Sequence, residues 1–196
     1  MRPRTAAAAA GVLATAALAS GCSQVENGSA VPSSEVGVVV HQPPQLSPPV
    51  SNPRDIRAYG DRPCEVFTLE QLTEFGFDLP PDNTETMPDG HKTCVWIDSG
   101  YTGRLMAGPF ADWDVLERTY AYREALPIFE PVQIAGLPAV VHQPGPAIGT
   151  CHVTVGLARR QGLDVSFSDL REPYEDPCGA ARIAAEVAVG NLPPLR

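Results

Sequence analysis

Lysine, and charge in general, are scarce in this 196-residue chain. Lys92 is the single lysine beside 13 arginines, and charged residues make up only 19% of the sequence. The 23 acidic residues leave a formal net charge of -9. Because nucleic acids are bound by basic faces, this balance argues against a nucleic-acid partner. The hydrophobic fraction of 43% is ordinary for a globular protein, which excludes disorder of the whole chain.

Motifs of common enzyme classes are missing as well. The sequence contains no G-x-S-x-G elbow, Walker loop, H-E-x-x-H motif or G-x-G-x-x-G loop. Its cysteines form no C-x-x-C pair, which argues against both a redox-active dithiol and a structural zinc site. The sequence therefore predicts a protein that is not an enzyme, with no catalytic residues, no cofactor and no metal ion.

The chain has four histidines, and no two of them have a metal-ligand spacing. His142 or His152 can be combined on paper with Ser166 or Ser168 and with Asp164 as base, nucleophile and acid. Such a set needs all three groups close together in space, which the linear sequence does not indicate. The simpler interpretation is that each histidine is a surface residue or a hydrogen-bonded one.

Carboxylates gather near the end of the last strand-like segment. Their order does not fit a known calcium loop, so a solvated acidic face is the preferred interpretation over a Ca²⁺ site. The residues concerned are Asp164, Asp169, Glu172, Glu175 and Asp176.

The first residues have the pattern of an export signal. Residues 6–18 form an uncharged apolar run of 13 residues, whereas a membrane-spanning helix needs about 20. A short basic start at Arg2 and Arg4 precedes this run, so residues 1–21 are predicted to be a signal peptide. The run ends in Leu-Ala-Ser-Gly-Cys at Cys22, which resembles a bacterial lipobox. The alternative is ordinary secretion, with cleavage at an Ala-x-Ala-like site and loss of Cys22.

Lipidation at Cys22 predicts a protein held at the outer face of the cell membrane by its lipid anchor. Two or more acyl chains give stable attachment, whereas the acidic body is repelled by anionic lipid. Residues 22–58 are predicted to be the lipidated cysteine and a disordered, proline-rich tether. This follows because residues 23–57 contain six prolines and no Phe, Tyr or Trp, too few groups to form a core.

Residues 59–196 are predicted to form a single α+β domain, an antiparallel sheet flanked by helices. Thr68 with Gln71 fits a capping box at a helix start, Asp112 is expected to cap a second helix, and Asp176 with Pro177 a third. Alternating apolar residues indicate strands at 93–98, 105–107, 131–141, 152–158 and 163–167, with a hairpin turn near 159–162 and a bulge or edge near 136–138. Residues 80–92 are expected to be a polar loop.

The four cysteines after Cys22 are an even number in an exported chain, which indicates disulfides. Four cysteines allow three connectivities. We favour Cys64–Cys94 and Cys151–Cys178, because each of these pairs ties the start of a helix to a strand.

The order of these features resembles one known family. After the lipobox at Cys22 come Thr-Cys-Val-Trp at 93–96, Ile-Ala-Gly-Leu-Pro-Ala-Val at 134–140, Cys151 leading a strand, and Asp-Pro-Cys at 176–178. In this order they resemble the actinobacterial lipoprotein family known as domain of unknown function 3558. The resemblance implies an envelope lipoprotein and assigns no activity and no catalytic residues.

Three functions are compatible with the sequence. The favoured one is non-enzymatic binding of an envelope protein or a small ligand by a membrane-anchored, extracytoplasmic domain. The second is an accessory or structural subunit of an envelope membrane complex. The third is a hydrolase of envelope components, which requires a pocket where serine, histidine and carboxylate converge.

Overall fold

The computed structural model describes residues 45–77, 83–145, 149–170 and 176–196. The predicted signal peptide, the predicted lipidation site Cys22 and the tether as far as residue 44 lie outside this set. Within the described residues, no helix has the length and apolar character needed to cross a membrane.

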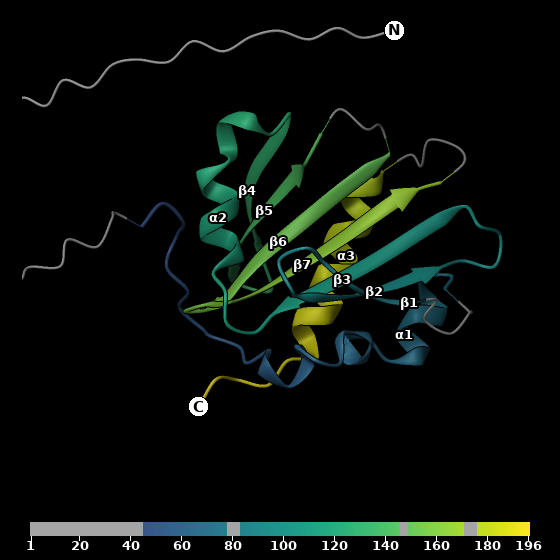
Figure 1. Ribbon diagram of the computed structural model, residues 1–196, viewed down its shortest axis with the longest axis horizontal. Helices are drawn as coiled ribbons and strands as arrows, with labels where there is room; N and C mark the ends of the chain where they lie inside the picture. Colours follow the sequence, from purple (N-terminus) through teal and green to yellow (C-terminus); the bar gives the residue numbers. More distant parts are fainter. Residues whose placement is uncertain (1–44, 78–82, 146–148, 171–175) are drawn as a thin grey trace, which may run out of the picture. The chain divides into compact units, whose positions relative to one another are not determined.

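Seven antiparallel strands form one sheet in the order β1-β2-β3-β7-β6-β5-β4 (Figure 1). This confirms the predicted α+β class. The longest strands, β6 and β7, lie near the centre, and β1 and β4 form the edges. The strands are β1 (Asn83–Thr86), β2 (Lys92–Ile97), β3 (Gly103–Phe110), β4 (Ile128–Ile134), β5 (Leu137–Gln143), β6 (Thr150–Ala158) and β7 (Gln161–Asp169).

The central hairpin follows directly from the sequence pattern. Ala158 pairs with Gln161, so Arg159 and Arg160 form a two-residue turn in which Arg160 has a φ of 59°. Alternate residues of β6 and β7 then point to opposite faces of the sheet. One face carries the main core, in which Val153, Val155, Leu157, Leu163 and Val165 are fully buried.

Three α-helices accompany the sheet: α1 (Leu69–Glu74), α2 (Val115–Ala121) and α3 (Pro177–Gly190). The predicted capping box is present, with Thr68 and Gln71 each bonding the other's backbone. Asp176 caps α3 through a bond from the Gly179 backbone at 2.7 Å, and Pro177 is its first residue, as predicted. The buried face of α3 consists mostly of alanines, which let the helix pack closely on the core face of β6 and β7.

Helix α2 packs on the opposite face of the same strands (Figure 1). Gly156 and Gly162 are paired across β6 and β7, directly beneath it. A Cβ at Gly156 would lie 2.7 Å from Leu116, and one at Gly162 would lie 2.4 Å from Val115. The glycines therefore permit the close approach of α2 that builds one wall of the cavity described below.

Both favoured disulfides are present. Cys64, in a short 3-10 helix at Pro63–Val66, is bonded to Cys94 in β2. Cys151 in β6 is bonded to Cys178 in the first turn of α3. Each bond therefore ties a helix start to a strand of the sheet, as predicted.

Several predicted boundaries were wrong for local reasons. The segment 131–141 is a hairpin of β4 and β5, because Ala135 and Gly136 both adopt positive φ, 49° and 77°, and turn the chain. The cap of α2 is Asp114 rather than Asp112, and its side chain accepts the Glu117 backbone N–H at 3.1 Å. β3 extends well beyond 105–107, and part of the expected loop at 80–92 is strand β1.

The domain begins earlier than the predicted boundary at 59. Ile56 is fully buried, and the Arg54 backbone N–H donates to the Leu157 carbonyl at 2.9 Å. Further upstream, the backbone N–H groups of Leu46 and Ser47 donate to the Glu117 carboxylate on α2 at 2.7 and 2.9 Å. Residues 45–58 are thus part of the domain, because they supply hydrogen bonds and a buried side chain that composition alone does not reveal.

Candidate functional site

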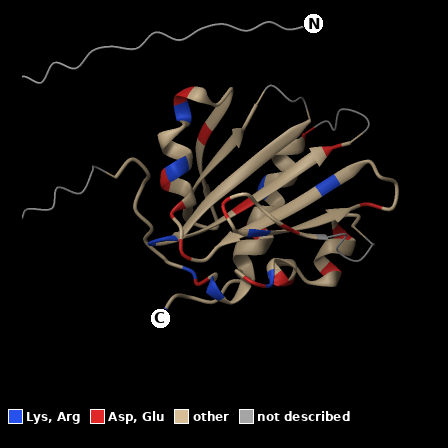
Figure 2. Ribbon diagram, in the orientation of Figure 1, with Lys and Arg blue, Asp and Glu red and all other residues tan. Residues whose placement is uncertain are grey.

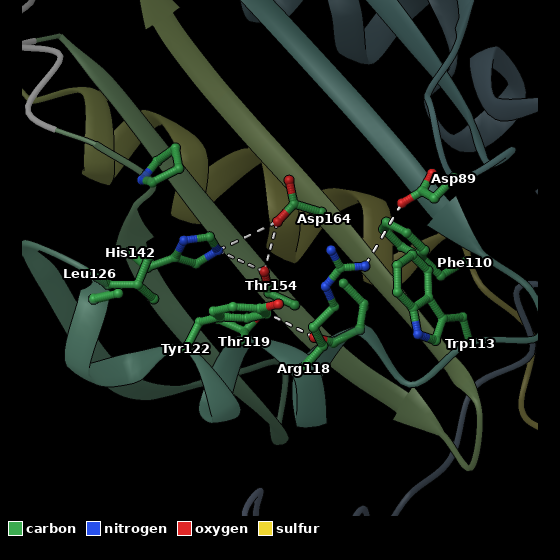
Figure 3. Close-up of a pocket in the computed structure, with 13 residues that line it drawn as sticks. Asp89, Phe110, Trp113, Arg118, Thr119, Tyr122, Leu126, His142, Thr154 and Asp164 are labelled. Carbon is green, nitrogen blue, oxygen red and sulfur yellow. Dashed lines mark hydrogen bonds and ion pairs between the residues drawn. The ribbon is translucent and has the colours of Figure 1, made fainter. Parts of the chain in front are cut away.

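A cavity of about 370 Å³ lies between α2 and the sheet face beneath it (Figure 3). One wall is aromatic and comes from the end of β3 and the residues before α2. The opposite wall comes from the residues that follow α2. The floor is polar and is formed by the central strands. Phe110 and Trp113 form the aromatic wall. Tyr122, Ala125 and Leu126 form the opposite wall. The polar floor consists of His142, Thr154 and Asp164.

The pairing of β5, β6 and β7 places the polar side chains of the cavity floor next to one another. His142 in β5 is paired with His152 in β6, and Thr154 in β6 is paired with Asp164 in β7. All four side chains lie on the α2 side of the sheet, because they alternate with the core residues of the same strands. The two imidazole rings stack with centroids 5.3 Å apart.

Asp164 is the centre of a hydrogen-bonded network. One of its carboxylate oxygens is 2.8 Å from His152 Nδ1, and the other accepts the Thr154 hydroxyl at 2.7 Å. The same Thr154 oxygen is 2.8 Å from His142 Nε2, which is also 3.6 Å from the Asp164 carboxylate. Since the single hydroxyl proton goes to Asp164, the His142 Nε2–H must be the donor to Thr154.

This arrangement leaves His142 Nδ1 without a partner among the described residues. His142 is 8% exposed, and Nδ1 is buried with no hydrogen-bond partner among the described residues. An unsatisfied buried polar atom costs about 1–3 kcal/mol, so the network does not by itself account for a histidine at this position.

The network also sets the charges of the floor. Burial alone would raise the pKa of Asp164, but the two histidines and their hydrogen bonds hold that pKa far below its ordinary value of 3.8. Burial would lower the pKa of His152, but the adjacent Asp164 carboxylate outweighs it and raises the pKa above 6.5. The floor thus contains an ionised carboxylate beside an imidazole that readily takes a proton.

Arg118 is the cation of the cavity. Its guanidinium carbon lies 4.4 Å from the Trp113 ring centroid and 5.8 Å from that of Tyr122. These contacts hold the charged group against aromatic faces, where it is attracted by their quadrupoles. Its ion pair with Asp89 is long, at 4.0 Å, and Asp89 is in closer contact with His91.

The charges of the domain as a whole are dispersed. In the view of Figure 2, lysine and arginine residues lie on several separate elements and are interspersed with acidic ones. The guanidinium in the cavity is therefore a local feature, distinct from any extended basic stripe in this view.

The structure brings together part of the arrangement considered for a hydrolase. His152 and Asp164 are bonded, and Ser166 is paired with His152 across the strands. Among the described residues, however, neither Ser166 nor Ser168 is hydrogen-bonded to a histidine. Ser168 instead accepts the Thr150 hydroxyl at 3.2 Å.

The predicted acidic face is not a single feature. Asp164 belongs to the buried network, whereas Asp176 caps α3. Glu172 and Glu175 lie outside the described residues.

Two further participants, Thr154 and Arg118, were not singled out by any sequence pattern. Trp113 is partly buried and lines the cavity, whereas Tyr120 is buried. A usable signal was present: Val153, Val155, Leu157, Leu163 and Val165 alternate on the core face, which leaves the even-numbered residues of both strands on the other face. The direct pairing of Thr154 with Asp164 depends in addition on a register shift between Gly156 and Ala158.

Neither the curated proteins nor the solved structures contain a match. A family model described as "Protein of unknown function (DUF3558)" matches residues 17–191, which is most of the chain. The chain therefore belongs to the DUF3558 family of proteins of unknown function.

Proposed function

We propose that this protein is a lipid-anchored binding protein at the outer face of the cell membrane, and that its cavity takes a small ligand. The observation that supports this proposal most strongly is the cavity itself, in which an aromatic wall, the Arg118 guanidinium and a polar floor lie together. Small-molecule sites typically have this composition, a largely apolar pocket with a few convergent polar groups.

The charges in the cavity favour a ligand with an apolar or aromatic body and an anionic head. The acceptors of Asp164 are already engaged by His152 and Thr154. Among the residues that the structure describes, the ion pairing of Arg118 is limited to its long contact with Asp89, so its guanidinium has donors to offer an anion. The ligand body would lie between the Trp113 and Tyr122 rings, where apolar surface is removed from water.

Anilinonaphthalene sulfonate, an aromatic anion, is a suitable probe of this proposal. We expect the protein to bind it with a dissociation constant on the order of tens of micromolar. Arg118→Gln should weaken binding about tenfold or more, because a charge-assisted hydrogen bond is lost. Tyr122→Ala should weaken it about fivefold, because part of one wall is removed. Fluorescence titration measures both effects.

Two matched variants serve as controls. Tyr101 is 56% exposed and Tyr122 is 57% exposed, but Tyr101 lies outside the cavity, so Tyr101→Ala should leave binding unchanged. Arg182, which is paired with Glu130 at 2.6 Å, provides the same comparison for Arg118. If Arg118→Gln bound the dye as tightly as Arg182→Gln, the assignment of the cavity would be wrong.

The anchor is supported by the lipobox at Cys22 and the basic start that precedes it. We expect wild-type protein to incorporate labelled fatty acid and to sediment with membranes, and Cys22→Ala to do neither. Acylation followed by membrane fractionation of the producing cells tests this. Equal acylation and equal membrane association of the two proteins would contradict the anchor and leave the cavity proposal standing.

A further inference from the structure

We infer that the floor of the cavity is a binding site for a divalent transition-metal ion, Zn²⁺ by its ligand chemistry, held by His142, His152 and Asp164. The inference goes beyond the proposed function, because three side chains of the protein would hold the ion and no organic ligand is needed. It requires no residue outside the described part of the chain.

The three side chains already converge. Each offers one ligand atom, and these atoms all lie within 4.8 Å of one another. Ligand atoms around a tetrahedral Zn²⁺ are about 3.3 Å apart, given metal–ligand distances of about 2.0–2.1 Å. The nearest approaches of the Asp164 oxygens to His152 Nδ1 and His142 Nε2 are 2.8 and 3.6 Å, on either side of that spacing. Small side-chain rotations would therefore complete the set.

The backbone that carries these ligands is well fixed. They lie on three adjacent strands, β5, β6 and β7, whose register is set by continuous pairing. Sites on regular elements hold their geometry better than sites on loops. The neighbouring Thr154 hydroxyl donates to Asp164 at 2.7 Å, the kind of second contact that orients a ligating carboxylate.

The donor set favours zinc over the hard cations. Two imidazoles with one carboxylate suit Zn²⁺, whereas Mg²⁺ and Ca²⁺ take oxygen ligands almost alone. A set of three protein ligands leaves one tetrahedral position open. His142 and Asp164 also line the cavity, so that position faces it. Both rings would be neutral when bound, with His142 Nδ1 and His152 Nε2 carrying the protons.

The test is calorimetric titration of Zn²⁺ into the full-length chain, purified in detergent. Cys22→Ser is used as the background, so that the result is the same whether or not Cys22 is lipidated. We expect one Zn²⁺ per chain. His152→Gln and Asp164→Asn should each weaken Zn²⁺ binding by at least about 100-fold. Loss of a residue that only hydrogen-bonds to a metal ligand already costs up to about 100-fold in affinity, and these two residues are ligands themselves. His91→Gln, which alters a histidine beside a different aspartate, should leave the affinity unchanged.

Co²⁺ absorption keeps the test independent of how well the variants fold. In the unsubstituted site, Co²⁺ should show the visible bands of four-coordinate nitrogen and oxygen ligation without thiolate charge transfer. The inference is overturned if the parent chain binds no metal in a one-to-one ratio. It is also overturned if Co²⁺ gives an octahedral spectrum, or if His91→Gln is the variant that loses the metal. None of these outcomes bears on binding of the dye in metal-free buffer.

Discussion

A chain in which Cys151 and Cys178 are both replaced by alanine is expected to lose about 3.5 kcal/mol of unfolding free energy. The bond closes a loop of 27 residues, so its loss frees the unfolded chain from a large constraint. It also fixes the start of α3 against β6, beneath the strands that carry the cavity floor. Urea denaturation followed by circular dichroism measures the loss.

The other disulfide provides an internal comparison. Cys64–Cys94 closes a loop of 30 residues, so the entropic cost of removing it should be nearly equal. The two double variants should therefore unfold at similar midpoints. Losses below about 1 kcal/mol for both would show that the bonds contribute little, contrary to the range usual for small exported domains.

Asp164→Asn is expected to lower the free energy of unfolding by about 3 kcal/mol near pH 6. The substitution removes the buried negative charge with which His152 and the Thr154 hydroxyl interact. The effect should depend on pH. The raised pKa of His152 stabilises the fold below its ordinary value of 6.5, and this contribution is lost as pH rises through the folded pKa. The lowered pKa of Asp164 stabilises the fold above 3.8, and that contribution is lost as pH falls through the folded pKa.

The difference between wild type and Asp164→Asn should therefore be largest between pH 3.8 and 6.5 and should shrink at alkaline pH. Denaturation curves of both proteins, measured from pH 3.8 to alkaline pH, give the difference in unfolding free energy directly. Asp112→Asn, at an exposed aspartate near α2, is the matched control and should change stability by less than about 0.5 kcal/mol at every pH. A constant offset for Asp164→Asn would mean that its charge is unimportant.

Local signals in the sequence were sufficient for much of the fold. Thr68 with Gln71, and Asp176 with Pro177, satisfy the first backbone groups of a helix by their own side chains, so neighbours in the chain decide the outcome. The hairpin at Arg159 and Arg160 was likewise readable from the alternation of apolar residues on both sides.

Features that depend on tertiary contacts were not readable. The turn at Ala135–Gly136 lacks the Asn-Gly or Asp-Gly signature and places an alanine at positive φ, so the hairpin resembled one interrupted strand. The packing of α3 was not readable either, because alanines on that helix provide the contact with the sheet, whereas the larger Ile183 is exposed.

The candidate site shows the same division. Asp164 could be assigned to the same face as Thr154 from the apolar alternation of the two strands, but its direct pairing with Thr154 depends on a register shift between Gly156 and Ala158. His142 could not be placed from the sequence. The pairing of His142 with His152 depends on the register of β5 against β6. The connection between those strands contains Pro144-Gly145, a turn signal, but it is longer than the two-residue turns that fix a hairpin register. The position of Arg118 depends in turn on how closely α2 approaches Gly156, a contact between distant segments.

We propose that the cavity between α2 and the sheet is the binding site of this domain. Backbone amide chemical shifts recorded during titration with anilinonaphthalene sulfonate locate the bound dye residue by residue. We predict that the largest changes fall on α2 and on the cavity side of β5, β6 and β7, with α3 little affected. Changes concentrated on α3, or around the smaller hollow near Phe77 and Leu105, would contradict the claim.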